Sequence, residues 1–84
     1  MQGRHEHSDP TLLNETCWID FGQDQAPITC RVSEIYTHWA WIKCPAFNQV
    51  PDYFSLLFTA DGQVSRKCRL ISRSNSMLVL KFLD

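Results

Sequence analysis

Four cysteines are the residues of this chain with the most varied chemistry. They stand at positions 17, 30, 44 and 68, and no two of them form a C-x-x-C pair. Structural zinc sites use such close pairs to build their tetrahedral geometry, and these spacings contain none. We therefore expect buried structural thiols without a bound metal, because free cysteine is among the most buried residue types. A metal site, a disulfide or a reactive thiol is the alternative for Cys17, Cys30, Cys44 and Cys68.

The histidines and the known catalytic motifs do not indicate an enzyme. His38 has no nucleophile near it in the sequence. His5 and His7 stand with Asp9 in a polar N-terminal stretch that is typical of a solvated segment, with adventitious metal binding as the alternative. The chain lacks a G-x-x-x-x-G-K phosphate loop, a G-x-G-x-x-G fingerprint, a G-x-S-x-G elbow and an H-E-x-x-H zinc motif. We predict a protein without catalytic residues, metal or cofactor.

An aromatic segment and a basic segment could instead bind a partner. Trp39 and Trp41 are two residues apart, so in a strand both share one face, opposite Ala40 and Ile42. Packing in the core is the commoner role of such rings, and contact with a partner is the alternative that two indoles on one face of a small core suggest. Residues 63–81 contain no acid and five cations, which are Arg66, Lys67, Arg69, Arg73 and Lys81.

These two segments together predict a partner-binding surface. Tryptophan and arginine are enriched at the centres of interfaces, because large rings and planar guanidinium groups give much contact area for each immobilised side chain. A basic segment in a chain of net charge −1 would attract an acidic protein. Single-stranded nucleic acid also favours cations and rings, but the nearly neutral charge makes it the less favoured partner. The predicted surface comprises Trp39, Trp41, Arg66, Lys67, Arg69 and Arg73.

Alternation of apolar and polar residues indicates strands as the elements that position these side chains. Residues 28–33 (ITCRVS) alternate without a fault, as a strand with one face on a core must do. Residues 44–52 contain two prolines, which cannot donate to a sheet, so a surface connection is expected there. Other candidate strands are residues 17–21, 39–43, 53–59, 63–73 and 77–83.

Turn residues divide these strands into hairpins. Asp61-Gly62 predicts a two-residue type I′ turn, because that turn needs a positive φ at both central positions. Residues 73–76 (RSNS) turn the chain into its last strand. No segment has a helical period, so six short strands predict a small antiparallel barrel or sandwich.

The length and composition allow one small domain. The chain has 84 residues, of which 44% are hydrophobic and 20% charged, so it is too apolar to stay unfolded. We expect a flexible head over residues 1–14 and the barrel over residues 15–84. The longest apolar run has four residues (MLVL), far below the ~20 that span a membrane. Without an export signal, a cytoplasmic location is expected.

Residues 17–82 resemble the PilZ family of bacterial domains, which as a class sense cyclic di-GMP. Residues 30–40 (CRVSEIYTHWA) stand where the family has a D-x-S-x-x-G motif, with Glu34, Tyr36 and Trp39 at the Asp, Ser and Gly positions. Residues 54–73 resemble the family's strand, hairpin and strand that end in C-R-V-x-W-R. The resemblance implies a six-stranded antiparallel β-barrel with little or no helix, and a degenerate ligand site at Glu34, Tyr36 and Trp39.

Departures from the family pattern concern this ligand site. The R-x-x-x-R motif before the family's first strand is missing, because Ser8 stands four residues after Arg4 and the next arginine is Arg31. Tyr36 replaces a small hydroxyl residue and Trp39 replaces a glycine. The resemblance therefore implies a protein-interaction adaptor of bacterial signalling or motility, with cyclic di-GMP binding lost or weak. The alternatives are a cyclic di-GMP receptor with non-standard residues and a barrel that binds single-stranded nucleic acid.

Overall fold

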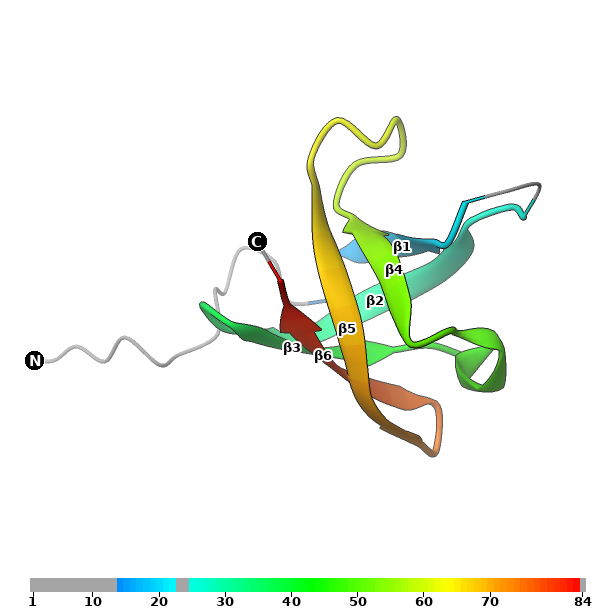
Figure 1. Cartoon of the computed structure of the whole chain (residues 1–84), viewed down its shortest axis with the longest axis vertical. Helices are drawn as coiled ribbons and strands as arrows, with labels where there is room; N and C mark the ends of the chain where they lie inside the picture. The colour runs from blue at the N-terminus through cyan, green and yellow to red at the C-terminus, as the bar shows by residue number, and fades with distance from the viewer. Residues whose placement is uncertain (1–13, 23–24, 84) are drawn as a thin grey trace, which may run out of the picture.

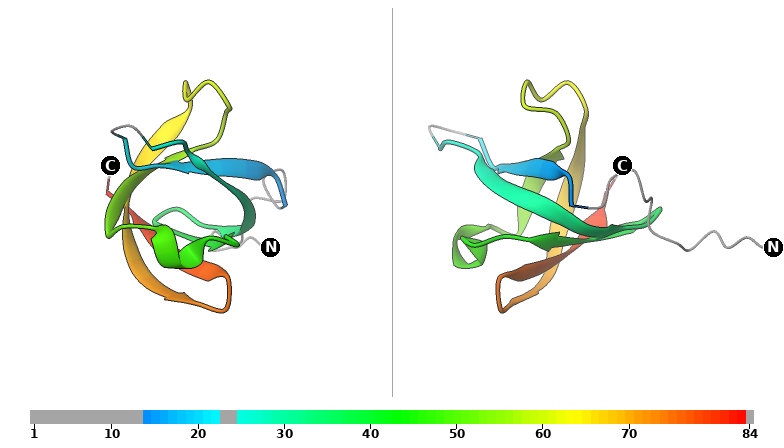
Figure 2. Two further views of the ribbon diagram at one scale, coloured as in Figure 1. Left: turned by 90° about the vertical axis from the view of Figure 1, so that its right-hand side faces the viewer. Right: turned by 180° about the vertical axis from the view of Figure 1, so that it is seen from behind.

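Six antiparallel strands close into a barrel in the computed structural model, which describes residues 14–22 and 25–83 (Figure 1). The order of the strands around the barrel is β1-β2-β3-β6-β5-β4, and they curve round a common interior (Figure 2). This confirms the expected all-β, six-stranded antiparallel barrel. The strands are β1 (Thr16–Asp20), β2 (Ile28–Ile35), β3 (Trp39–Lys43), β4 (Tyr53–Leu57), β5 (Ser65–Ser74) and β6 (Met77–Phe82).

Alternation within the strands fills the barrel with apolar side chains. Ile19, Val32 and Ile42 are completely buried, and no polar or charged side chain is buried in the part of the chain that the structure describes. All four cysteines belong to this core, and each is at most 2% exposed. Cys17 in β1 lies directly opposite Cys30 in β2. The interior is therefore a packed core, and any binding site must lie on the outer surface.

The connection between β3 and β4 contains a single 3-10 turn, η1 (Phe47–Gln49). Phe47 packs against the core, and Val50 just after the turn is buried. The Arg73 guanidinium donates hydrogen bonds to the Phe47 and Asn48 carbonyls at 3.2 and 3.3 Å. Arg73 thus ties the end of β5 to this connection. Over residues 14–22 and 25–83, no helix has the length and apolarity to cross a bilayer.

The predicted N-terminal head lies outside the described residues, apart from Asn14. The Asn14 N–H donates to the Val32 carbonyl at 2.7 Å, and the Arg31 guanidinium donates to the Asn14 carbonyl at 2.9 Å. The described backbone therefore begins alongside β2. His5, His7 and Asp9 also lie outside the described residues, within which no cluster of three potential metal ligands occurs.

The predicted type I′ turn at Asp61-Gly62 is wrong. A longer loop joins Leu57 to Ser65, and of the two predicted turn residues only Gly62, at 76°, has a positive φ. The Gln63 N–H and the Thr59 hydroxyl donate to the Asp61 carboxylate at 3.0 and 2.7 Å, and they hold the pKa of that carboxyl below its usual value. These local hydrogen bonds compete with the pairing of β4 and β5. The pairing therefore ends at Leu57 and Ser65, before the predicted turn.

The two-residue hairpin turn lies instead between β5 and β6. Asn75 and Ser76 have φ values of 51° and 66°, and Ser74 pairs with Met77 across the turn. Positive φ at both central positions is the requirement of a type I′ turn. Asparagine enters this left-handed region readily, whereas serine carries a steric penalty there.

Replacing Ser76 by glycine is expected to raise the free energy of unfolding by up to about 1 kcal/mol, because glycine takes a positive φ without the clash of a Cβ atom. Ser74→Gly is the matched control, since Ser74 is also exposed but lies in β5. That variant should lose roughly 0.5–1 kcal/mol. Urea unfolding of the three proteins measures both effects, and an equal loss in both variants would argue against the turn assignment.

Candidate partner-binding surface

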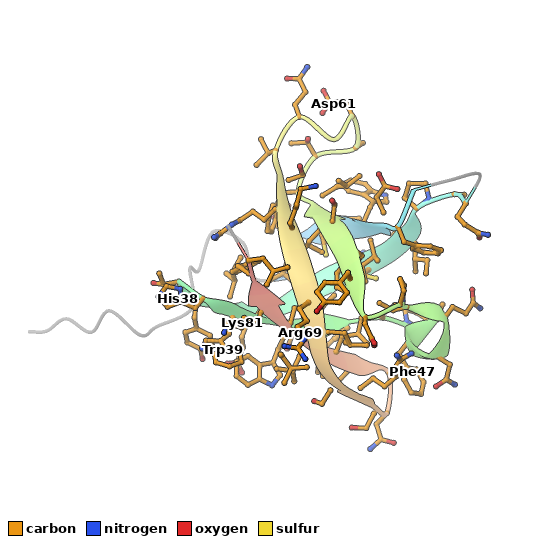
Figure 3. The ribbon with its side chains drawn as sticks, in the orientation of Figure 1. His38, Trp39, Phe47, Asp61, Arg69 and Lys81 are labelled. Atoms are coloured by element: carbon orange, nitrogen blue, oxygen red, sulfur yellow. The ribbon has the colours of Figure 1, made fainter. Side chains whose placement is uncertain are left out.

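One row of outward-facing side chains crosses four neighbouring strands. Trp39 in β3 lies opposite Lys81 in β6, Lys81 lies opposite Arg69 in β5, and Arg69 lies opposite Tyr53 in β4. Figure 3 shows Trp39, Lys81 and Arg69 grouped on one part of the barrel, well away from Asp61. The two rings at the ends of the row are 41% and 62% exposed. The row therefore presents ring, cation, cation and ring to solvent.

An open groove adjoins this row. Tyr36, Trp39, Trp41 and Val79 line a hollow of about 500 Å³. Trp41 is half-buried, lies opposite Val79 in β6, and meets the Tyr36 ring edge-on at a centroid distance of 5.6 Å. We use the name aromatic–cationic surface for Trp39, Trp41, Val79, Lys81 and Arg69.

Both indoles lie outside the core, so the expectation that they pack in the core is wrong. Ala40 and Ile42 are the inward residues of β3 and are completely buried. Alternation along the strand then places residues 39, 41 and 43 on the outer face. The barrel core is complete without Trp39 and Trp41.

The four predicted cations of β5 divide into two groups. Arg66 lies over the Phe82 ring at 4.1 Å from its centroid, and Arg73 donates hydrogen bonds to carbonyls of η1. Both arginines therefore make contacts within the barrel. Lys67 and Arg69 are exposed. Of these, the strand register brings Arg69 into the row with Trp39. The surface predicted from the sequence does not include Lys81 and Val79, which only the pairing of β3 with β6 identifies, or Tyr53 at the end of the row, which only the pairing of β4 with β5 identifies.

Positive charge is concentrated on three adjacent strands. β3, β6 and β5 contain six of the eight Lys and Arg residues of the chain and no Asp or Glu. Arg69 and Lys81 are like charges directly opposite each other, an arrangement that costs stability. Among the described residues, no acidic side chain pairs with either of them. An anionic partner would relieve this repulsion.

Two acidic side chains of β1 and β2 make local hydrogen bonds. The Asp20 carboxylate accepts the Gly22 N–H at 2.9 Å. The Glu34 carboxylate accepts a hydrogen bond from the Tyr36 hydroxyl. Glu34 and Tyr36, two of the three positions at which the sequence resembles the PilZ ligand motif, thus bind each other, while Trp39 at the third position points outward.

A second hollow, of about 340 Å³, is lined by residues of β1, β4 and β5, and Tyr53 at the end of the row is one of them. Its lining includes Asp20, Ser55 and Lys67, which stand in one row across β1, β4 and β5. One acid and one cation in the same hollow give no preference for a charged partner. The aromatic–cationic surface is therefore the stronger candidate.

Comparison with protein-family models, curated proteins and solved structures finds no match to this chain. The geometry defines the molecule as a small closed β-barrel with an exposed aromatic–cationic surface. A more specific function has to be inferred from the residues of this surface.

Proposed function

We propose that this protein is a non-enzymatic, PilZ-like interaction module of the bacterial cytoplasm that binds an acidic protein through its aromatic–cationic surface. The observation that carries the proposal is the exposed Trp39 ring beside Lys81 and Arg69, two cations that make no ion pair with an acidic side chain among the described residues. Tryptophan and arginine are the residues that most often dominate binding energy at protein interfaces. A role in cyclic di-GMP-type signalling or motility follows from the resemblance alone.

The shape of the site favours a macromolecule over a small ligand. Small-molecule sites enclose most of their ligand within a pocket. The groove beside Trp39 is instead open, and its lining is aromatic and aliphatic, with the cations of the row at its edge. A protein segment can cover such a groove and reach the cations at the same time.

Single-stranded nucleic acid is the second candidate partner. The observation that favours it is the exposed ring at each end of the row, because bases stack on such rings while cations contact the phosphates. The net charge of −1 weakens this candidate, since nucleic-acid binding draws mainly on an excess of positive charge.

Photo-crosslinking in bacterial cells tests the proposal. A crosslinking amino acid at Val79 should capture an acidic protein, whereas the same probe at the exposed Gln63, in the loop between β4 and β5, should not. Lys81→Glu should remove the crosslink, and Lys43→Glu, the matched exposed lysine two residues beyond Trp41, should leave it. If both probe positions captured the protein equally, or if the crosslink persisted in Lys81→Glu, the aromatic–cationic surface would be excluded as the binding site.

Trp39→Ala separates binding from folding in the same assay. Because the ring lies outside the core, its loss should change the free energy of unfolding by no more than about 0.5 kcal/mol while removing the crosslink. Ile42→Ala, which empties a buried position of the same strand, should cost about 2–5 kcal/mol and calibrates the measurement. A loss of several kcal/mol in Trp39→Ala would assign the indole a structural role.

A further inference from the structure

Arg69 and Lys81 are placed to hold a single anionic group. They lie directly opposite each other on adjacent strands, which are ~4.8 Å apart. Both are exposed, and both project from the outer face, because the next residues inward, Leu70 and Leu80, are buried. One carboxylate above the two strands can therefore contact both cations and cancel their mutual repulsion.

The groove lies at a fixed distance from this anion position. Val79, which lines the groove together with Trp41, precedes Lys81 by two residues on the same face of β6. Two residues of a strand span ~6.6 Å. An extended peptide repeats its side chains on one face at the same interval. In a partner strand that lies along β6, one side chain therefore enters the groove, and the side chain two residues away lies over the cations.

We propose that the partner presents an extended segment in which Asp or Glu stands two positions from a large apolar residue. This inference rests on the proposed function and specifies the chemistry that the surface selects. The apolar side chain packs against Trp39, Trp41 and Val79, and the carboxylate binds between Arg69 and Lys81. Neither contact alone distinguishes one partner segment from another, but the spacing between the two contacts does.

The strands around β6 leave the partner no backbone edge to pair with. β6 is hydrogen-bonded to β3 on one side and β5 on the other, and the barrel is closed. Recognition must therefore come from side chains on the outer face, and strand addition is not the mode of binding. A segment that lies on this face is held by its alternate side chains alone, which is why their spacing matters.

Selection from a random peptide display library, with the full-length chain as bait, tests the spacing. Enriched peptides should share an acidic residue two positions from Leu, Ile, Phe or Trp. Synthetic peptides with one Glu and one Leu two positions apart should bind roughly tenfold or more tightly than peptides with the same residues adjacent. Arg69→Glu and Lys81→Glu should each remove this preference, and Lys43→Glu should preserve it.

Three outcomes would overturn the inference. Enriched peptides could lack the acid or the spacing, the adjacent-residue peptides could bind equally well, or an oligothymidylate could bind this surface more tightly than any peptide. If peptides of another pattern still bind and still depend on Trp39, the inference fails while the proposed function stands. If the Val79 crosslink is absent as well, both fail.

Discussion

Raising the pH from 9 to 12 is expected to destabilise the folded barrel by about 3 kcal/mol through Cys17 alone. Burial raises the pKa of the Cys17 thiol from its ordinary value of 9.0 to about 12, and the neighbouring Cys44 and Cys68 thiols add to the shift. In the unfolded chain the thiol ionises near its ordinary pKa, whereas in the barrel it stays protonated. The stabilisation is therefore complete below pH 9 and is lost as the pH rises toward 12.

Urea unfolding at a series of alkaline pH values measures this loss. Lysine and tyrosine also titrate in this range, so the comparison is with Cys17→Ala, which keeps those groups and removes one thiol. The wild-type chain should lose stability more steeply than the variant. Burial, together with the Cys30–Cys44 hydrogen bond, also raises the pKa of Cys30. The free energy of unfolding of Cys30→Ala should therefore also fall less steeply with pH than that of the wild-type chain. Parallel curves for all three proteins would contradict the explanation.

Thiol labelling provides an independent measurement of the same burial. All four cysteines are buried, and a thiol with a raised pKa forms little of the reactive thiolate near neutral pH. Labelling should therefore proceed only as fast as the barrel opens. Rapid labelling of the folded chain, or stoichiometric zinc in protein purified without added metal, would contradict the prediction of metal-free structural thiols.

The strands could be predicted from the sequence because their alternation is local. Cys30 and Val32 stand at inward positions of a faultless apolar–polar pattern, and both are buried in the structure. The closure of the barrel through the β3–β6 pair could not be predicted in the same way. That pair joins residues 34 to 42 positions apart, and its register places Trp39 opposite Lys81. No local pattern specifies such a partner.

The turns show how a local signal can be outweighed. Asp61-Gly62 has the right composition for a tight hairpin, but the Asp61 side chain accepts hydrogen bonds from Gln63 and Thr59 and a longer loop results. Asn75-Ser76 has the weaker signal and forms the tight turn. Its neighbours Ser74 and Met77 are already paired as strand ends, so the strands fix the turn length.

The basic side chains of β5 show why the surface was only partly predictable. Arg66 and Arg73 are seven positions apart, and an uninterrupted strand would place them on opposite faces. The register shift between Leu70 and Ser72 inserts one extra residue, so both arginines turn away from the outer face that carries Arg69. Alternation alone could identify the face of Trp39 and Trp41, but not the effect of this bulge.

Titration with cyclic di-GMP is expected to show a dissociation constant in the millimolar range. In the family that the chain resembles, two arginines before the first strand clamp the ligand, and neither has a counterpart here. Charge-assisted hydrogen bonds contribute ~1.5–3 kcal/mol each, so the loss of two weakens binding by about two to four powers of ten. At the remaining motif positions, the Glu34 carboxylate is engaged by the Tyr36 hydroxyl and Trp39 carries a large ring in place of glycine.

Calorimetry of this chain beside a PilZ domain that carries both arginines measures the difference. Tyr36→Ser combined with Trp39→Gly introduces the small residues of the family motif without its arginines, so it should not raise the affinity. A dissociation constant at or below ~10 μM for the wild-type chain would contradict the prediction, because a site without the clamp should not reach it. If Arg69→Glu then abolished that binding, the aromatic–cationic surface itself would be the nucleotide site, because Arg69 and Lys81 supply the only pair of adjacent outward cations in the row across β3, β6, β5 and β4 that the structure describes.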